Sequence, residues 1–227
     1  TFKFNPNGST SYLYMYNPLV LNSVIFDGNA YIYSGPFECN NLSIGPGSNI
    51  YFGSGYTHTI NNNFIAVGTR DQLVNIKSTN PGNSTTLFVN TFSGTSLDVE
   101  YAIIQDITLD NGSAFTTTEI ASQSIDKGGN TGWDFLTEPL LPADFYWVGG
   151  SGFWSDYGSH WAMSSGGTDF YSYAPLLVDN VYFDGNSFPS GGTLTLDYPI
   201  IIHDMDWNGS TTSVSISDDG NEDNTLT

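Results

Sequence analysis

Basic residues are nearly absent from this sequence. Only 4 Lys and Arg accompany 23 Asp and Glu, which gives a formal charge of −19 at pH 7. Nucleic-acid binding is therefore not expected, because neutralising phosphates requires clustered basic side chains. The same deficit argues against docking on anionic membrane surfaces. Charged residues of both signs make up only 12% of the chain, about half the usual share in a soluble domain.

Cysteine and long apolar runs are also scarce. Cys39 is the only cysteine, so no disulfide can form within the chain, and we interpret it as a small buried apolar side chain. No apolar run reaches the length of a membrane span, and the first residues lack the pattern of a signal peptide. We therefore expect no membrane insertion. Because the chain simply starts at Thr1 and stops at Thr227, we interpret it as a piece of a longer protein.

Small neutral residues supply most of the polarity. Asn, Ser, Thr and Gly together account for 96 of the 227 residues, and aromatic residues for 15%. This composition is typical of many short strands joined by tight turns and excludes a helical bundle. The hydrophobic fraction of 39% is low but sufficient for a core, so wholesale disorder is not expected either.

An internal repeat is the most informative feature. Residues 18–29 (PLVLNSVIFDGN) and 175–186 (PLLVDNVYFDGN) are identical at seven of twelve positions, at a constant offset of 157. An offset of 163 then aligns residues 41–44 with 204–207, which implies an insertion in the second copy. One repeat therefore spans roughly 160 residues, and the chain holds parts of two.

The joint between the two copies is marked by proline and by charge. We assign residues 1–137 to the body and end of one repeat, and residues 146–227 to the Trp-rich opening part of the next. Between them, residues 138–145 form a stiff spacer that contains Pro139 and Pro142. Residues 1–137 hold ten acids and four bases, whereas residues 138–227 hold thirteen acids and no Lys or Arg.

The first copy contains short runs of alternating polarity separated by Gly, Asn and Pro. In residues 97–103 the odd positions are apolar while Asp98 and Glu100 point outward, as a half-buried strand requires. Good two-residue hairpin turns are missing, and Asn/Gly corners recur at residues 45–47, 61–63 and 80–83. We therefore predict an all-β fold: a right-handed parallel β-helix, or solenoid, followed by the start of a second repeat. The predicted strands lie at 42–44, 49–52, 64–67, 73–77, 86–89 and 97–104.

Four stretches of sequence point to a known group of proteins. They are residues 73–82 (LVNIKSTNPG), 99–106 (VEYAIIQD), 124–135 (SIDKGGNTGWDF) and 146–161 (YWVGGSGFWSDYGSHW). The first three resemble β-helical segments of very large repetitive surface proteins of the Bacteroidota, and the fourth resembles their head motif. The resemblance implies an exported adhesin or surface filament, often a type IX secretion cargo, and not an activity. The first copy departs from it, because Phe4 aligns with Trp161 at the offset of 157.

The head motif permits two interpretations. Trp147, Trp154 and Trp161 are spaced by seven residues, with glycines between them. Exposed rings would form a carbohydrate-stacking platform, as in a binding module. Buried rings would instead cap the open end of a solenoid, which has to be covered. We favour the buried cap. The glycines are no phosphate loop, because no Lys follows them.

Other candidate sites are weaker. Two carboxylate pairs, Asp98 with Glu100 and Asp204 with Asp206, could serve acid–base chemistry only within a cleft, so we interpret them as solvated faces. The acidic segment 218–224 lacks the spacing of a calcium-binding EF-hand, and calcium remains an open alternative. His58, His160 and His203 fit no zinc spacing. We therefore assign no catalytic, cofactor-binding or metal-binding residue and expect no cofactor.

These features favour a non-enzymatic function. We predict a structural and adhesive segment of a large repetitive secreted or cell-surface protein. Its expected partners are neighbouring repeats of the same chain, and surface glycans or other copies of itself. The alternatives are a carbohydrate-binding module and, further behind, a β-helix polysaccharide lyase or hydrolase, which would need a groove holding two carboxylates and a cation.

Overall fold

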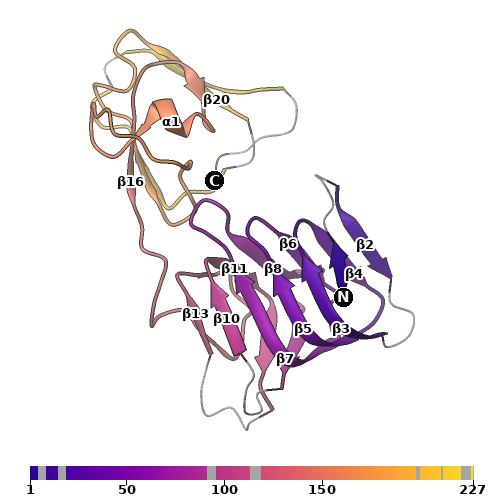
Figure 1. Ribbon diagram of the computed structural model, residues 1–227. Coiled ribbons are helices and arrows are strands. Elements are labelled where there is room, and N and C mark those ends of the chain that lie inside the picture. Colours follow the sequence, from indigo (N-terminus) through magenta and orange to yellow (C-terminus); the bar gives the residue numbers. More distant parts are fainter. Residues whose placement is uncertain are drawn as a thin grey trace. The chain divides into compact units, whose positions relative to one another are not determined.

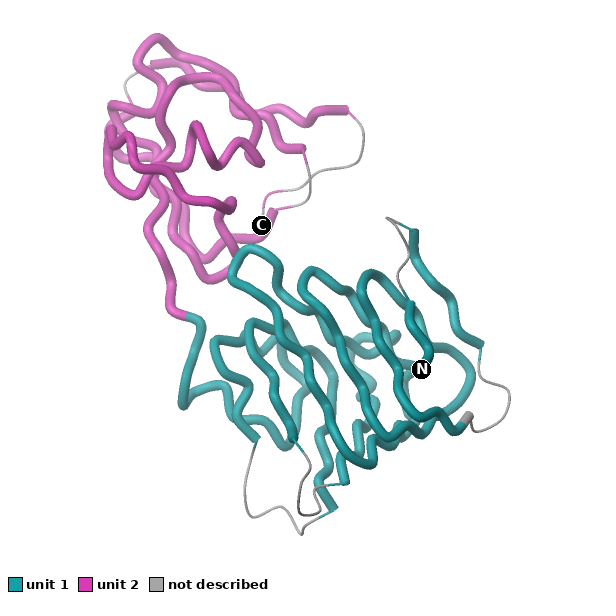
Figure 2. Tube along the Cα trace, viewed as in Figure 1, with its two compact units in different colours: residues 1–140 teal, residues 141–227 magenta. Residues whose placement is uncertain are grey.

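The chain is all-β and divides into two compact units. The computed structural model describes residues 1–4, 9–14, 19–90, 96–112, 119–197, 200–210, 212–220 and 226. The only helix in this part of the chain is the single turn α1 (Tyr157–His160). Unit 1 comprises residues 1–140 and unit 2 residues 141–227 (Figure 2). The boundary falls within the segment 138–145 in which a spacer was predicted.

Unit 1 consists of two sheets whose strands lie side by side (Figure 1). Every pairing between its named strands is parallel in the described residues, as a solenoid requires and as the sequence predicted. The larger sheet contains β1 (Phe2–Phe4), β3 (Leu19–Phe26), β5 (Phe37–Ile44), β7 (Thr57–Val67), β9 (Thr85–Val89), β10 (Ser96–Glu100), β12 (Ile107–Asp110), β13 (Glu119–Ser122) and β15 (Trp133–Asp134). The smaller sheet contains β2 (Ser11–Tyr14), β4 (Ala30–Tyr33), β6 (Asn49–Phe52), β8 (Val74–Ser78), β11 (Ala102–Gln105) and β14 (Ile125–Asp126).

The long strands of the larger sheet each contribute to two ladders. The first half of β7 pairs with β9, whereas its second half pairs with β10. The register between β5 and β7 shifts at the same place, between Cys39 and Asn41. Together with the smaller sheet, unit 1 therefore has three parallel ladders, and the chain contributes strands to them in turn.

Apolar side chains form continuous rows inside unit 1. Val24, Leu42 and Phe64 are register partners on successive strands, and each is almost fully buried. Ile50 and Ile76 continue a second row on the smaller sheet. Burying one such side chain stabilises the fold by roughly 1.5–3 kcal/mol. The rows therefore hold neighbouring strands together in one register.

Polar residues hold the outer face and the corners. The amide of Asn63 donates to Asn41 Oδ1 at 2.8 Å, and the backbone N–H of Ser96 donates to Asn63 Oδ1 at 3.1 Å. Corners were predicted at residues 45–47 and 80–83, and turns occur there with Gly47 and Gly82 at φ +71° and +80°. The predicted corner at 61–63 is instead the bend inside β7, where the asparagine ladder forms.

The prediction of one strand at residues 97–104 is wrong. The segment forms two strands, β10 and β11, because Tyr101 adopts φ +50° and turns the chain between them. The bend changes the phase of the alternation: Ala102 and Ile104 are buried, whereas Ile103 is not. Nothing in a tyrosine signals this left-handed conformation, which few non-glycine residues adopt.

Unit 2 repeats the parallel arrangement with fewer strands. One of its sheets has the order β18 (Trp161–Ala162), β16 (Asp144–Trp147), β19 (Asn180–Tyr182) and β21 (Asp204–Asp206); the other has the order β17 (Gly152–Phe153), β20 (Gly192–Leu196) and β22 (Val214–Asp218). Only β18 is antiparallel among these named pairs. The core of unit 2 is aromatic, with Phe145, Phe183 and Phe188 packed around three tryptophans.

The strand register agrees with the offsets of the sequence repeat. Val24 pairs with Leu42 in unit 1, and Val181 pairs with Met205 in unit 2. The offset of 157 aligns Val24 with Val181, and the offset of 163 aligns Leu42 with Met205. The coil between the paired residues is longer in unit 2, which accounts for the change of offset. Phe26 and Phe183, the residues before the two Asp-Gly-Asn triplets, are both fully buried.

The two aligned stretches nevertheless differ in conformation. Residues 19–21 are part of β3, whereas 176–179 form a turn in which buried Asp179 accepts a hydrogen bond from Leu176 N at 2.9 Å. A carboxylate at this position stabilises a turn that the aligned Asn22 does not form. Pro18 lies outside the described residues.

The alignment of Phe4 with Trp161 is wrong as well. Phe4 pairs with Phe26 on β1 and β3, whereas in unit 2 the ring that lies beside Phe183 is that of Trp147, with ring centroids 6.2 Å apart. The offset fails here because unit 2 carries β17, α1 and β18 between its first two paired parallel strands.

Candidate interaction surfaces

The three tryptophans of the head motif are buried. Trp147, Trp154 and Trp161 have no measurable exposure. Trp161 packs edge-on against the other two, with ring centroids 4.9 Å from Trp147 and 4.7 Å from Trp154. The indole of Trp161 donates to Trp154 O at 2.8 Å, and that of Trp147 donates to Gly150 O at 2.8 Å. They form the centre of a core, as the cap interpretation predicted, and offer no platform for a sugar.

The head motif also covers the first edge of unit 2. β18 pairs antiparallel with β16, placing Trp161 opposite Trp147. His160 stacks on Trp147 at 4.4 Å with the ring planes 8° apart. The edge that precedes β16 is therefore paired and packed, which protects its backbone groups from other strands.

A ladder of tyrosines lies on the outer face of the smaller sheet of unit 1. Tyr12, Tyr31 and Tyr51 are register partners on β2, β4 and β6, and Tyr14 and Tyr33 form a second row beside them. Tyr31 and Tyr51 stack at 4.2 Å with planes 1° apart, and Tyr14 and Tyr33 at 5.5 Å. Burial and then the neighbouring Tyr51 raise the pKa of Tyr31 above its ordinary value.

The sequence interpretation missed this ladder, although two Tyr-x-Tyr triplets at 12–14 and 31–33 signal it. The rings stack on one another, so the free ring faces belong to the edge strand β2. Tyr12 and Tyr14 are accordingly 58% and 57% exposed. This group of five tyrosines, of which Tyr12 and Tyr14 are exposed and the other three half-buried, is a candidate binding surface.

The two carboxylate pairs lie on outer faces. Asp98 and Glu100 flank buried Val99 on β10, and Asp204 and Asp206 lie on β21 beside Asn180 and Tyr182. The first pair belongs to unit 1 and the second to unit 2. Asp98 and Asp204 are exposed, and Glu100 and Asp206 are half-buried.

The remaining candidates are the histidines, Cys39 and the acidic segment 218–224. In the described residues, no group of three or more His, Cys, Asp or Glu side chains could hold a metal ion. Asp218 accepts a hydrogen bond from Gly220 N at 2.6 Å in a turn, and residues 221–224 of the acidic segment lie outside the described residues. His160 and His203 belong to unit 2. Burial raises the pKa of the Cys39 thiol to about 12, consistent with the predicted small apolar role.

His58, which the sequence analysis considered only as a zinc ligand, is a buried titratable group. It lies in an inward row of unit 1 between Phe37 and Leu87, fully buried, and its Nδ1 accepts a hydrogen bond from Phe37 N at 3.4 Å. Its Nε2 has no partner among the described residues. Burial lowers the pKa of His58 to about 4, so the ring is neutral at pH 7.

In the described residues, β21 and β22 are the last strands of the two sheets of unit 2, and we call β21, β22 and Trp207 the open end of this unit. One face of Trp207 stacks on Phe183 at 3.9 Å. Ile216 is a register partner of fully buried Leu194, yet it is 47% exposed because no described strand follows β22. An open hollow of about 360 Å³ lies here, lined by Trp207, Ser210, Thr212, Val214 and Ile216.

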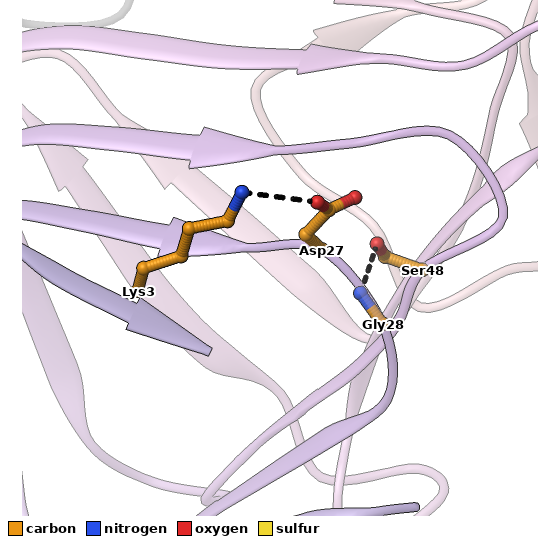
Figure 3. Close-up of polar contacts among 4 residues, drawn as sticks. All are labelled: Lys3, Asp27, Gly28 and Ser48. Atoms are coloured by element: carbon orange, nitrogen blue, oxygen red, sulfur yellow. Dashed lines mark hydrogen bonds and ion pairs between the residues drawn. The ribbon is translucent and has the colours of Figure 1, made fainter. Parts of the chain in front are cut away.

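In unit 1 we call β1 and β2 the open end. Both are edge strands in the described residues. Phe4 stacks on Phe26 at 5.1 Å, while Phe2 is 50% exposed. Between them Lys3 points outward, and its Nζ lies 3.3 Å from Asp27 Oδ2 (Figure 3). The turn after Asp27 is held by Gly28 N, which donates to Ser48 Oγ at 2.9 Å.

Comparisons with known proteins give no relative. No protein-family model, curated protein or solved structure matches this chain. Within the described residues, the structure has no helix that is long and apolar enough to cross a membrane.

Proposed function

We propose that unit 1 is a right-handed parallel β-helix and that the chain is a structural and adhesive segment of a large repetitive secreted or cell-surface protein. Parallel crossover connections are right-handed in about 98% of known cases, which supports the handedness. The non-enzymatic role and the exported location are part of this proposal. They rest on the repeat and on the resemblance of the sequence to Bacteroidota surface proteins.

The continuous inward rows are the observation that carries the structural role. Each inner strand of unit 1 finds its partners on the coils before and after it, as β5 does with β3 and β7. Such a stack is stabilised mainly by contacts between neighbouring coils, so its length can change without loss of the fold. A long spacer or filament segment needs this property.

Deletion of one whole coil tests this proposal. Leu42 and Phe64 are register partners on β5 and β7, so removal of residues 42–63 joins Asn41 to Phe64 in the same ladder position. The shortened chain is expected to keep its β-sheet circular dichroism and a cooperative melting transition. Removal of residues 42–52 alone breaks the register and serves as the control. If both deletions abolish folding, unit 1 is not a stack of interchangeable coils.

A glycan-binding module is the second candidate, and the tyrosine ladder is the observation that favours it. Tyrosine combines an apolar ring with a polar hydroxyl and is common at binding surfaces. Tyr12→Ser and Tyr14→Ser together would remove the exposed ring faces on β2. A glycan array with signals that vanish in this double variant would support binding there. Equal signals from both proteins, or none from either, would contradict glycan binding at the tyrosine ladder and leave the structural role as it stands.

A further inference from the structure

We propose that a row of four side chains on the outer face of the smaller sheet of unit 1 binds a glycan that carries negative charges, such as a chain of uronic acids or of sulfated sugars. The row consists of Tyr51, Lys77, Gln105 and Lys127, and we call it the lysine row. This inference rests on the second candidate function, glycan binding at the tyrosine ladder, and names its ligand class.

Strand register places the four residues next to one another. Tyr51 of β6 pairs with Lys77 of β8, and Lys77 pairs with Gln105 of β11. Lys127 follows β14, and its backbone N–H donates to Ile104 O at 2.9 Å, which places it beside Gln105. β6, β8 and β11 are each paired on both sides (Figure 1). Tyr51, Lys77 and Gln105 therefore lie within the sheet and not at its edge.

The smaller sheet carries little negative charge for so acidic a chain. Its six strands contain one acidic residue, Asp126, whereas the strands of the larger sheet contain six. The carboxylate of Asp126 accepts hydrogen bonds from Gly128 N at 2.8 Å and from Asn130 Nδ2 at 2.6 Å, so it is held in its own turn. Lys77 and Lys127 are two of only four basic residues in the chain. The lysine row is therefore a local excess of positive charge.

Within the part of the chain that the structure describes, neither lysine forms an ion pair. Both are half-buried, and burial and then the positive charge of Lys127 lower the pKa of Lys77. An anion bound between them would offset this repulsion and accept hydrogen bonds from both ammonium groups. Two strand spacings, roughly 10 Å, separate the backbones of the two lysines. A ligand with charges on successive units can reach both.

The neighbouring side chains favour a sugar over other anions. Tyr51 ends a stack of rings, 4.2 Å from Tyr31, and tyrosine combines an apolar ring with a hydroxyl. Gln105 adds an amide that both donates and accepts, which suits sugar hydroxyls. The net charge of −19 repels a long nucleic acid. A short oligosaccharide is affected less, because charges beyond about 8 Å are largely screened at physiological ionic strength.

Isothermal titration calorimetry with a short oligogalacturonate tests the proposal, and the methyl ester of the same oligomer is the uncharged control. The wild-type chain should bind the acid at least about tenfold more tightly than the ester, because hydrogen bonds to charged groups are the stronger ones. Added salt should weaken binding of the acid and leave the ester unchanged. Sulfated dextran oligomers show whether sulfate can replace the carboxylate.

Matched variants assign the binding to the lysine row. Lys77→Gln and Lys127→Gln should each raise the dissociation constant for oligogalacturonate about tenfold, whereas Lys77→Arg keeps the charge and should retain most of the affinity. Lys3→Gln is the control, because Lys3 lies on the larger sheet with Asp27 3.3 Å away, and it should bind like wild type. All variants should keep their melting temperatures, since the altered side chains lie on outer faces.

Three results would overturn the proposal: no binding of the uronate or the sulfated sugar, equal binding of acid and ester, or unchanged affinity in both glutamine variants of the lysine row. A glutamate oligomer that binds as tightly as oligogalacturonate would also overturn it and assign the lysine row to an acidic peptide. Equal binding of acid and ester that is lost in the Tyr12→Ser, Tyr14→Ser double variant would leave glycan binding at the tyrosine ladder in place. If no saccharide binds, charged or neutral, glycan binding fails together with this inference.

Discussion

Units 1 and 2 share one strand arrangement but are closed at opposite ends. Unit 2 is closed where it begins, because β18 pairs with β16 and Trp161 packs on Trp147. Unit 1 is closed where it finishes. There, Gln123 N donates to Glu138 O at 2.6 Å, and Leu140 is only 5% exposed. At the other end of each unit, the described residues finish in edge strands that are paired on one side, β1 and β2 in unit 1 and β21 and β22 in unit 2.

The difference between the two units shows what can cover the last coil of a parallel stack. A coil in the middle needs only a partner on each side, which the aliphatic rows of unit 1 supply. An end needs something that is not a coil, and here it is an antiparallel strand with large rings in unit 2 and an irregular segment in unit 1. Where neither is present, apolar side chains such as Ile216 remain exposed.

The largest expected effect concerns the closed end of unit 2. Trp154→Ala should lower the stability of unit 2 by about 3–5 kcal/mol, because it empties the centre of the aromatic core. Four of the five tryptophans belong to unit 2, so urea unfolding followed by tryptophan fluorescence reports mainly on that unit. Phe153→Ala, at a neighbour that is 47% exposed, is the control with a small expected change. Equal losses from both substitutions would contradict the capping role of Trp154.

A matched pair of isoleucines compares a covered coil with an uncovered one. Ile50 of β6 is fully buried beneath Ile76, whereas Ile216 of β22 is 47% exposed. Ile50→Ala should cost about 2–5 kcal/mol and Ile216→Ala less than about 1 kcal/mol. Urea unfolding followed by far-ultraviolet circular dichroism measures both. A large loss from Ile216→Ala would mean that the end of unit 2 is covered in solution.

Acid should destabilise unit 1 through His58. Its pKa is about 4 in the folded chain and about 6.5 when unfolded, so the unfolded state binds the proton more tightly. Stability is therefore full above pH 6.5 or so and falls by about 3 kcal/mol as the pH drops through 4. His58→Leu should remove this part of the pH dependence, and Leu87 shows that leucine fits the same row. Parallel pH profiles of unfolding for the two proteins would contradict the burial of His58.

The asparagine ladder should have the smallest effect. Asn41 accepts a hydrogen bond from Asn63 on the outer face of unit 1, and Asn41→Ala should cost about 1 kcal/mol. Asn62→Ala, at an exposed neighbouring position, is the matched control. Thermal melting of both variants decides whether the ladder contributes. A loss from Asn62→Ala as large as that from Asn41→Ala would assign the effect to strand propensity instead.

The sequence predicted those features that depend on alternation and repetition. Parallel strands, the burial of Trp154 and the two offsets follow from patterns that side-chain burial imposes on the sequence. Bends are different: Tyr101 adopts a positive φ because the stack holds it there, and no residue preference reveals it. The turn at Asp179 was missed for a similar reason, since its aligned residue Asn22 lies in a strand.

The candidate surfaces were harder to predict than the fold. The spacing of Trp147, Trp154 and Trp161 predicted their burial in a cap correctly. The tyrosine ladder was not predicted. The tyrosine ladder depends on register between strands about 20 residues apart in the chain, which a single strand's pattern does not specify. The open ends become visible only when the pairing of every strand is known.

Hydrogen–deuterium exchange along the whole chain tests the central claim most directly, namely that each unit has one closed and one open end. At low protein concentration, amides of β5, β7 and β16 should exchange slowly, and those of β1, β2, β21 and β22 quickly. If β22 is as slow as β16 at low concentration, or β16 as fast as β22, the two units do not differ at their ends as the structure indicates.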